Sequence, residues 1–108
     1  MPNINKYQVP YYESIEFTLS NAESDYDLDA EQATFLTSVG PTLVWNQFPT
    51  RVTIRTDVDI SVKFNSTSNH SITIASTDSP FDWVGVVQNI YLTNASGGNA
   101  AVKIICRP

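Results

Sequence analysis

Apolar and polar residues alternate between residues 51 and 64 (RVTIRTDVDISVKF). The apolar members of this pattern are Val52, Ile54, Ile60, Val62 and Phe64. Since successive side chains of a β-strand point to opposite faces, a period of two predicts two half-buried strands. The polar link Thr56–Asp59 between them is short enough for a tight reversal, so the two strands are predicted to pair with each other.

The same alternation predicts further short strands along the rest of the chain. They cover residues 13–20, 25–30, 42–46, 71–76, 81–87, 88–93 and 101–106, while residues 33–39 fit either a strand or one helical turn. Turn residues recur roughly every 8–12 residues, and no stretch has the pattern of an ordinary helix. About eight short antiparallel strands with this spacing are typical of a single all-β domain, a β-sandwich or jelly roll.

The segment Asn94–Asn99 contains two adjacent glycines, which permit positive φ, and it is predicted to be a hairpin loop between the last two strands. On that pairing, the outward residues Tyr91 and Ile105 would form one apolar patch. Exposed apolar patches of this kind often mark interfaces between proteins.

The first twelve residues are predicted to form an extended N-terminal arm, so that the sandwich covers residues 13–108. Pro2 and Pro10 each bias the preceding residue toward extended geometry. The arm carries four apolar or aromatic residues, Tyr7, Val9, Tyr11 and Tyr12. These side chains suit either docking on a neighbouring subunit or packing along the same domain. Removal of residues 1–12 is expected to leave the domain folded and to abolish assembly.

Length and charge narrow the range of partners. A chain of 108 residues supports one hydrophobic core, and a hydrophobic fraction of 42% is that of a folded protein. Six Lys and Arg residues stand against eleven acidic residues, for a net charge of −5. Neither nucleic acid nor an anionic membrane is expected as a partner, because both require basic residues. The N-terminal residues lack the apolar run of a signal peptide.

Residue types that carry catalysis are scarce. The chain has one histidine, His70, in a polar turn, and one cysteine, Cys106, at a predicted strand end. This pair is too small a set for a tetrahedral zinc site, and no GxSxG motif is present. The chain is therefore expected to have neither an enzymatic activity nor a cofactor.

Asp25, Asp27 and Asp29 have the spacing that opens an EF-hand calcium loop. The sixth position of such a loop would be Ala30 and the twelfth Leu36, which excludes an EF-hand. On a strand the three carboxylates would share one face about 7 Å apart, too far to share one ion unless the chain bends. They are the candidate metal ligands of the sequence, and an acidic face turned to water or to a partner is the alternative.

Trp45 and Trp83 are candidates for stacking on sugar rings, as in the β-sandwich carbohydrate-binding modules. A role in the core is the preferred interpretation, because a domain of this size needs its large aromatic side chains to fill the sandwich.

Three stretches, DYDLDAEQATF, RVTIRTDVDISVKFNSTSNHSITIAS and SPFDWVGVVQNIYLTNASGGNAAVKII, together span Asp25 to Ile105. This series resembles small all-β structural proteins of tailed bacteriophages. The resemblance implies a non-enzymatic virion protein, made in the host cytoplasm, which assembles with other virion proteins and with copies of itself. The expected role is capsid decoration or cementing, with a neck or tail component as the second virion role. A carbohydrate-binding module is the alternative from another class.

Overall fold

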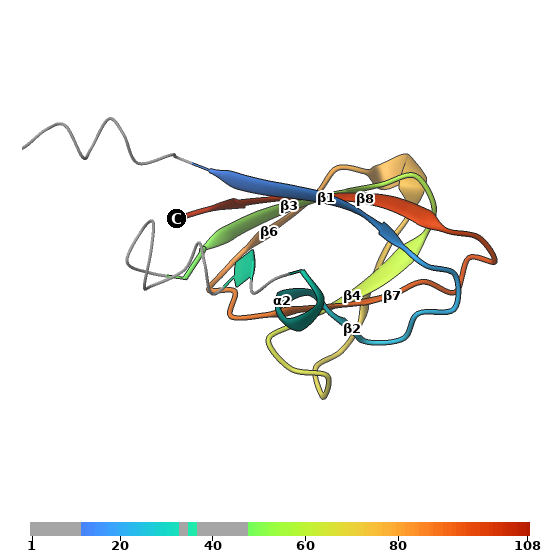
Figure 1. The fold of residues 1–108 in the computed structure, drawn as a ribbon. Helices are drawn as coiled ribbons and strands as arrows, with labels where there is room; N and C mark the ends of the chain where they lie inside the picture. Colours follow the sequence, from blue (N-terminus) through green and yellow to red (C-terminus); the bar gives the residue numbers. More distant parts are fainter. Residues whose placement is uncertain (1–11, 33–34, 37–47) are drawn as a thin grey trace, which may run out of the picture.

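In the part of the chain that the structure describes, eight strands form two four-stranded antiparallel sheets that face each other (Figure 1). The structure is a computed structural model that describes residues 12–32, 35–36 and 48–108. Its elements, in chain order, are β1 (Glu13–Leu19), β2 (Tyr26–Asp27), α2 (Leu28–Glu31), β3 (Arg51–Thr56), β4 (Ile60–Phe64), β5 (Ile72–Ile74), the 3₁₀-helix η1 (Ser76–Asp78), β6 (Phe81–Val84), β7 (Ile90–Thr93) and β8 (Ala100–Arg107).

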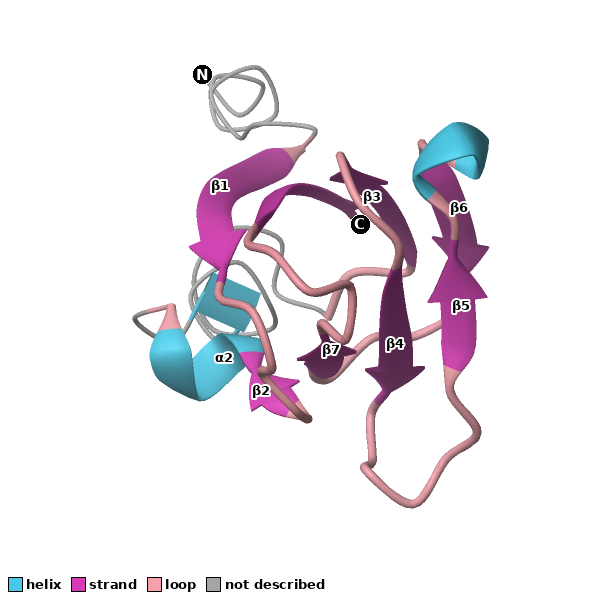
Figure 2. Cartoon of the chain, turned by 90° about the vertical axis from the view of Figure 1, so that its right-hand side faces the viewer, coloured by secondary structure: helices cyan, strands magenta, loops and turns pink. Residues whose placement is uncertain are grey.

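The strand order is that of a jelly roll. Sheet A has the order β1-β8-β3-β6 and sheet B the order β2-β7-β4-β5. The pairs are nested, because β4 pairs with β5, β3 with β6, β2 with β7, and β1 with β8. Figure 2 shows the sandwich from one end, with the strands of the two sheets on either side of the core. The predicted all-β sandwich or jelly roll is confirmed.

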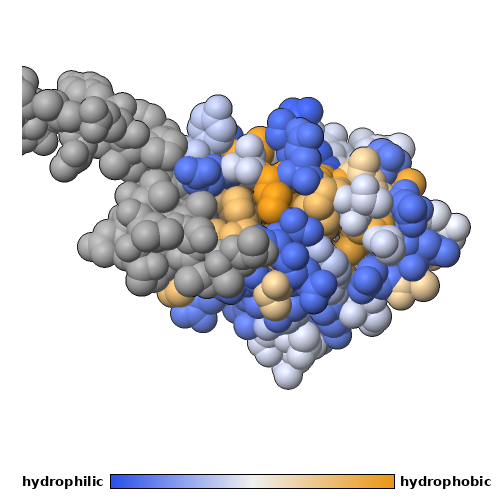
Figure 3. Space-filling model, viewed as in Figure 1, coloured by the Kyte–Doolittle hydropathy of each residue, from blue (hydrophilic) through white to orange (hydrophobic). Residues whose placement is uncertain are grey.

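The core lies between the sheets and is built by the alternating apolar residues. Its fully buried side chains include Leu19, Val52, Ile54, Val62, Ile74, Ile90, Leu92 and Ile104. Stacked aromatic pairs lie at its margins, Phe17 on Tyr26 with ring centroids 5.5 Å apart and Phe64 on Trp83 at 4.4 Å. On the side where β1 faces β2, some apolar surface is visible between more hydrophilic regions (Figure 3).

The strands predicted to pair as neighbours in sequence do not do so. β3 belongs to sheet A and β4 to sheet B, so the link Thr56–Asp59 crosses from one sheet to the other. Its two carboxylates bond elsewhere, since Asp57 Oδ1 accepts from Ala101 N at 2.8 Å and Asp59 Oδ1 from Ser76 N at 2.9 Å. The link between β7 and β8 also joins the two sheets. The predicted hairpins are wrong because alternation identifies faces and carries no information about pairing partners.

The acidic segment is a strand only at its start. β2 ends at Asp27, and α2 follows at once, so the prediction of one strand over residues 25–30 is wrong. Asp27 is the N-cap of α2, where its Oδ1 accepts from Ala30 N at 3.1 Å and from Asn89 Nδ2 at 2.8 Å. A capping carboxylate satisfies an N–H that has no partner within a helix, and this favours the change from strand to helix. As a result, Leu28 is buried whereas Ala30 is exposed.

Several predictions fall on residues outside the described ranges. These are Tyr7, Val9 and Tyr11 of the arm, the strand at residues 42–46 with Trp45, and most of residues 33–39. Tyr12 is described, directly precedes β1 and is 59% exposed. In the described part of the chain, no helix has the length and apolar character required to cross a membrane.

Candidate interaction surface

The outer face of sheet A is basic, although the whole chain is acidic. Four of the six Lys and Arg residues of the chain lie on it, namely Arg51 and Arg55 on β3 and Lys103 and Arg107 on β8. They alternate along their strands with buried residues such as Ile54 and Ile104, so they point outward. In the register of the two strands, Arg51 is opposite Arg107 and Arg55 is opposite Lys103.

These cations are only partly compensated within the domain. Lys103 Nζ lies 3.3 Å from Glu16 Oε1 on β1, in an exposed ion pair. Arg51 and Arg55 form no ion pair with any residue that the structure describes. Like charges directly opposite each other on a sheet are destabilising. The face therefore holds positive charge that an anionic neighbour would offset.

An apolar residue lies between the two cation pairs. Ile105 is half-buried on the outer face, opposite Ser14 of β1 and Thr53 of β3. Thr53 Oγ1 donates to Asp82 Oδ1 on β6 and accepts from Arg107 Nη1 at 3.4 Å. The neighbours of Ile105 on the outer face are polar or charged, so Ile105 is a small apolar centre within a charged rim.

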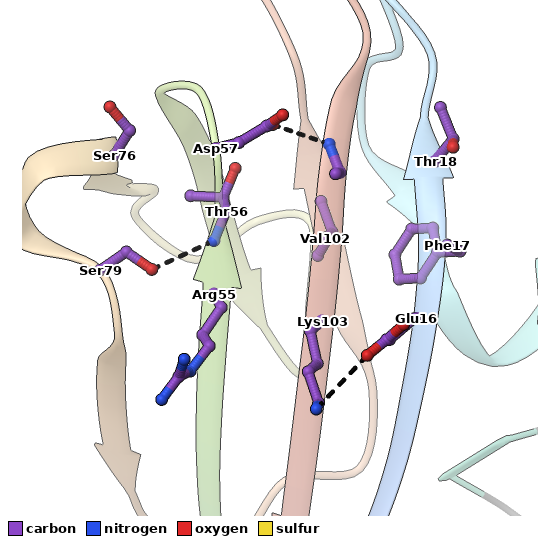
Figure 4. A pocket seen from close by; sticks show the side chains of 11 residues that line it. Glu16, Phe17, Thr18, Arg55, Thr56, Asp57, Ser76, Ser79, Val102 and Lys103 are labelled. Atoms are coloured by element: carbon purple, nitrogen blue, oxygen red, sulfur yellow. Dashed lines mark hydrogen bonds and ion pairs between the residues drawn. The ribbon is translucent and has the colours of Figure 1, made fainter.

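A groove of about 720 Å³ extends this face toward the links between the sheets. It runs from β1 across β8 and β3 to η1, and its polar lining includes Arg55, Asp57, Ser79 and Lys103. Figure 4 shows Lys103 reaching Glu16, while Arg55 extends away from that ion pair. Ser79 Oγ accepts from Thr56 N at 3.2 Å. The groove is thus a polar continuation of the basic face.

The outer face of sheet B has an aromatic centre and an acidic edge. Tyr91 of β7 is half-buried, opposite Lys63 of β4 and Asp27 of β2. Lys63 Nζ lies 3.1 Å from Asp25 Oδ1, which offsets its charge. The remaining acids of the segment, Asp29 and Glu31, are on α2, which contacts β7. Tyr91 and Ile105 therefore lie in different sheets, and the prediction that they form one patch is wrong.

The three candidate metal ligands have separate structural roles. Asp25 is ion-paired with Lys63, Asp27 caps α2, and the backbone N–H of Asp29, in the first turn of α2, donates to Asn89 Oδ1 at 3.2 Å. They do not line one strand face, because the chain turns into α2 at Leu28. Over the described ranges, no group of three or more His, Cys, Asp and Glu side chains is arranged to hold a metal ion.

The single cysteine, Cys106, is buried between the sheets. Desolvation by burial, aided by the negative charge of Glu13, raises the pKa of the Cys106 thiol to about 12. The thiolate is the reactive form of cysteine, so burial lowers the reactivity of Cys106 at neutral pH. His70, in contrast, is exposed in the link between β4 and β5.

Trp83 is a half-buried residue that packs against the core, as predicted. One face of its indole is covered by Phe64. Its Nε1 is buried and has no hydrogen-bond partner among the described residues. Gly85 approaches the same atom with φ +151°, and a Cβ at this position would lie 3.2 Å from Nε1. A side chain at residue 85 would therefore strain the backbone and crowd the indole.

Asn94 holds together the links at the groove end of the molecule, a role that the alternation of apolar and polar residues does not predict. The residue is fully buried, and its Nδ2 donates to Leu19 O at 2.9 Å and to Gly98 O at 2.8 Å. Its Oδ1 accepts from Ser96 N at 3.1 Å. One side chain thus joins the end of β1 to the link between β7 and β8.

No protein-family model matches the chain, and no curated protein matches it in sequence.

Proposed function

We propose that this chain is a non-enzymatic structural protein of a bacteriophage virion, and that it decorates or cements the capsid through protein–protein contacts. The nested strand order β1-β8-β3-β6 and β2-β7-β4-β5 carries the proposal. Viral capsid domains use this architecture, and so do lectins and cupins. Since a fold alone does not decide function, the character of the surfaces must support the choice.

The two outer faces support binding to proteins. Each has a half-buried apolar or aromatic residue, Ile105 or Tyr91, surrounded by charged and hydroxyl side chains. An apolar centre within a polar rim is the usual arrangement of a protein–protein interface. The backbone links near the groove are tied by Asp57, Asp59 and Asn94, so the surface is held in shape before a partner binds.

The test is to purify particles from the source lysate on a density gradient and to quantify this chain against the major shell protein by mass spectrometry. A ratio near that of the shell protein is expected for decoration or cement. A small ratio would assign the chain to the neck or tail instead. Absence from washed particles, with the chain recovered from the soluble fraction, would overturn the virion proposal.

Carbohydrate binding is the second candidate, because lectins also use this fold and the domain has a polar groove on its surface. Trp83 does not favour it, since Phe64 already covers one face of its ring. The purified chain can be screened on a glycan array beside an Arg55→Ala variant, whose altered side chain lines the groove. Binding that Arg55→Ala weakens would support this candidate, and an array without signal would remove it.

A further inference from the structure

We propose that copies of this chain assemble head to tail, with the outer face of sheet A of one copy packed on the outer face of sheet B of the next. The inference rests on the proposed structural role and specifies a partner for both faces. It starts from the positions of the two candidate anchors, Ile105 on sheet A and Tyr91 on sheet B. Residues on opposite sides of one sandwich cannot both enter a single two-fold contact.

Charge disfavours the symmetric alternatives. In a two-fold contact through sheet A, the four cations of that face would meet the same four cations of the other copy. A two-fold contact through sheet B would leave Asp27, Asp29 and Glu31, at the β2 edge of that sheet, without the cations of sheet A as partners. Like charges facing each other across an interface cost affinity, whereas a basic face against an acidic edge is complementary. A contact of sheet A with sheet B is the arrangement that matches opposite signs.

The spacing on the two faces fits this contact. Arg51 and Arg55 are four residues apart on β3, a distance of about 13 Å at about 3.3 Å per residue. Ile105 of β8 lies opposite Thr53, midway between the two arginines along the strand. On sheet B, Tyr91 is adjacent to Asp27, and α2 carries the other acids beside β7. Placing Ile105 against Tyr91 with β3 over β2 brings Arg51 and Arg55 to the acidic edge formed by β2 and α2.

The arrangement has consequences for symmetry and strength. A heterologous contact produces a ring if its rotation closes and an open stack if it does not. The strands of sheet B have two, four, five and three residues, so at about 3.3 Å per residue and about 4.8 Å between strands their outer face offers roughly 220 Å², which is small for a stable interface. A single contact is therefore weak and sensitive to salt, and closure of a ring or attachment to a particle strengthens it by multivalency.

The test uses sedimentation of the full chain and of face-specific charge variants. The wild type is expected to self-associate at low ionic strength and to dissociate as salt is added. Arg51→Glu/Arg55→Glu alters sheet A, and Tyr91→Lys alters sheet B. Each variant is expected to weaken self-association about tenfold or more. Thr73→Lys is a second sheet-B variant at an exposed position, should Tyr91→Lys not fold, and Thr67→Glu in the link between β4 and β5 is the control.

Mixing the two face variants gives the decisive result. The sheet-A variant retains an intact sheet B, and the sheet-B variant retains an intact sheet A. The mixture is expected to form a one-to-one dimer that does not grow further, whereas neither variant associates alone. No dimer in the mixture, or a wild type that stays monomeric at low salt, would overturn the proposal. Sedimentation needs no particles, so its outcome is independent of whether the chain is found in virions.

Discussion

At the scale of single residues, the environment of Cys106 changes the pKa of its thiol. Alternation along the last strand predicts its burial, and the structure confirms this. The size of the effect depends on desolvation between two sheets and on Glu13, which is paired with Cys106 in the register of β1 and β8. Neither cause can be deduced from a strand pattern, because both depend on which strands are neighbours.

This perturbation predicts a loss of stability in alkali. The folded thiol has a pKa of about 12, against 9.0 for an unperturbed thiol. Between these values the unfolded chain has released its thiol proton while the folded chain keeps it. The free energy of unfolding therefore falls as pH rises from about 9 toward 12, and the thiol has no such effect at lower pH.

Denaturant unfolding across this pH range measures the effect, with Cys106→Ala as the matched variant. Other groups titrate in the same range, so the difference between the two pH profiles is the quantity of interest. The variant is expected to be less stable at neutral pH and to lose less stability in alkali. Parallel profiles for the two proteins would show that the thiol does not titrate as described.

At the scale of elements, the boundary between β2 and α2 depends on one carboxylate. Asp27→Ala removes the N-cap of α2 and the acceptor of Asn89 Nδ2. The expected cost is about 0.5–2 kcal/mol of folding stability, the range for loss of a helix N-cap. Urea denaturation measures it.

Asp27→Asn is the control, because asparagine keeps an oxygen that can cap the helix. It is expected to lose clearly less stability than Asp27→Ala. Equal losses for both substitutions would mean that the charge of Asp27, and not its capping bond, stabilises this boundary.

The elements also show what alternation can predict. Val52, Ile54, Val62 and Leu92 are buried as expected, because a period of two determines the two faces of any strand. The predicted pairing of strands was wrong, since β3 and β4 are joined by a short link and nevertheless belong to different sheets. Link length permits a hairpin but does not require one, and side chains such as Asp57 can bind a third strand instead.

For the whole molecule, the segregation of charge could not be read along the chain. Arg51 and Arg107 are opposite each other in space but lie in the middle and at the end of the sequence. Composition indicated an acidic protein, and the basic face became visible only once β3 and β8 were known to be neighbours. Alternation along their strands predicts that Tyr91 and Ile105 point outward. Their placement on opposite faces of the sandwich can be known only from the strand order of the two sheets. The arm of residues 1–12 and its role in assembly stay predictions.

The nesting of the strand pairs has a kinetic consequence. The strands of the innermost pair, β4 and β5, are close in sequence, and each further pair encloses the previous one. Loop closure is cheapest for the inner pairs and becomes cheaper for the outer pairs once the inner ones have formed. We expect β4 and β5 to meet first and β1 to dock last, a sequence of events that pulse-labelling hydrogen exchange can resolve. During synthesis, β1 emerges from the ribosome before the other seven strands of the two sheets, yet its one neighbour in sheet A, β8, is the last of these eight to emerge.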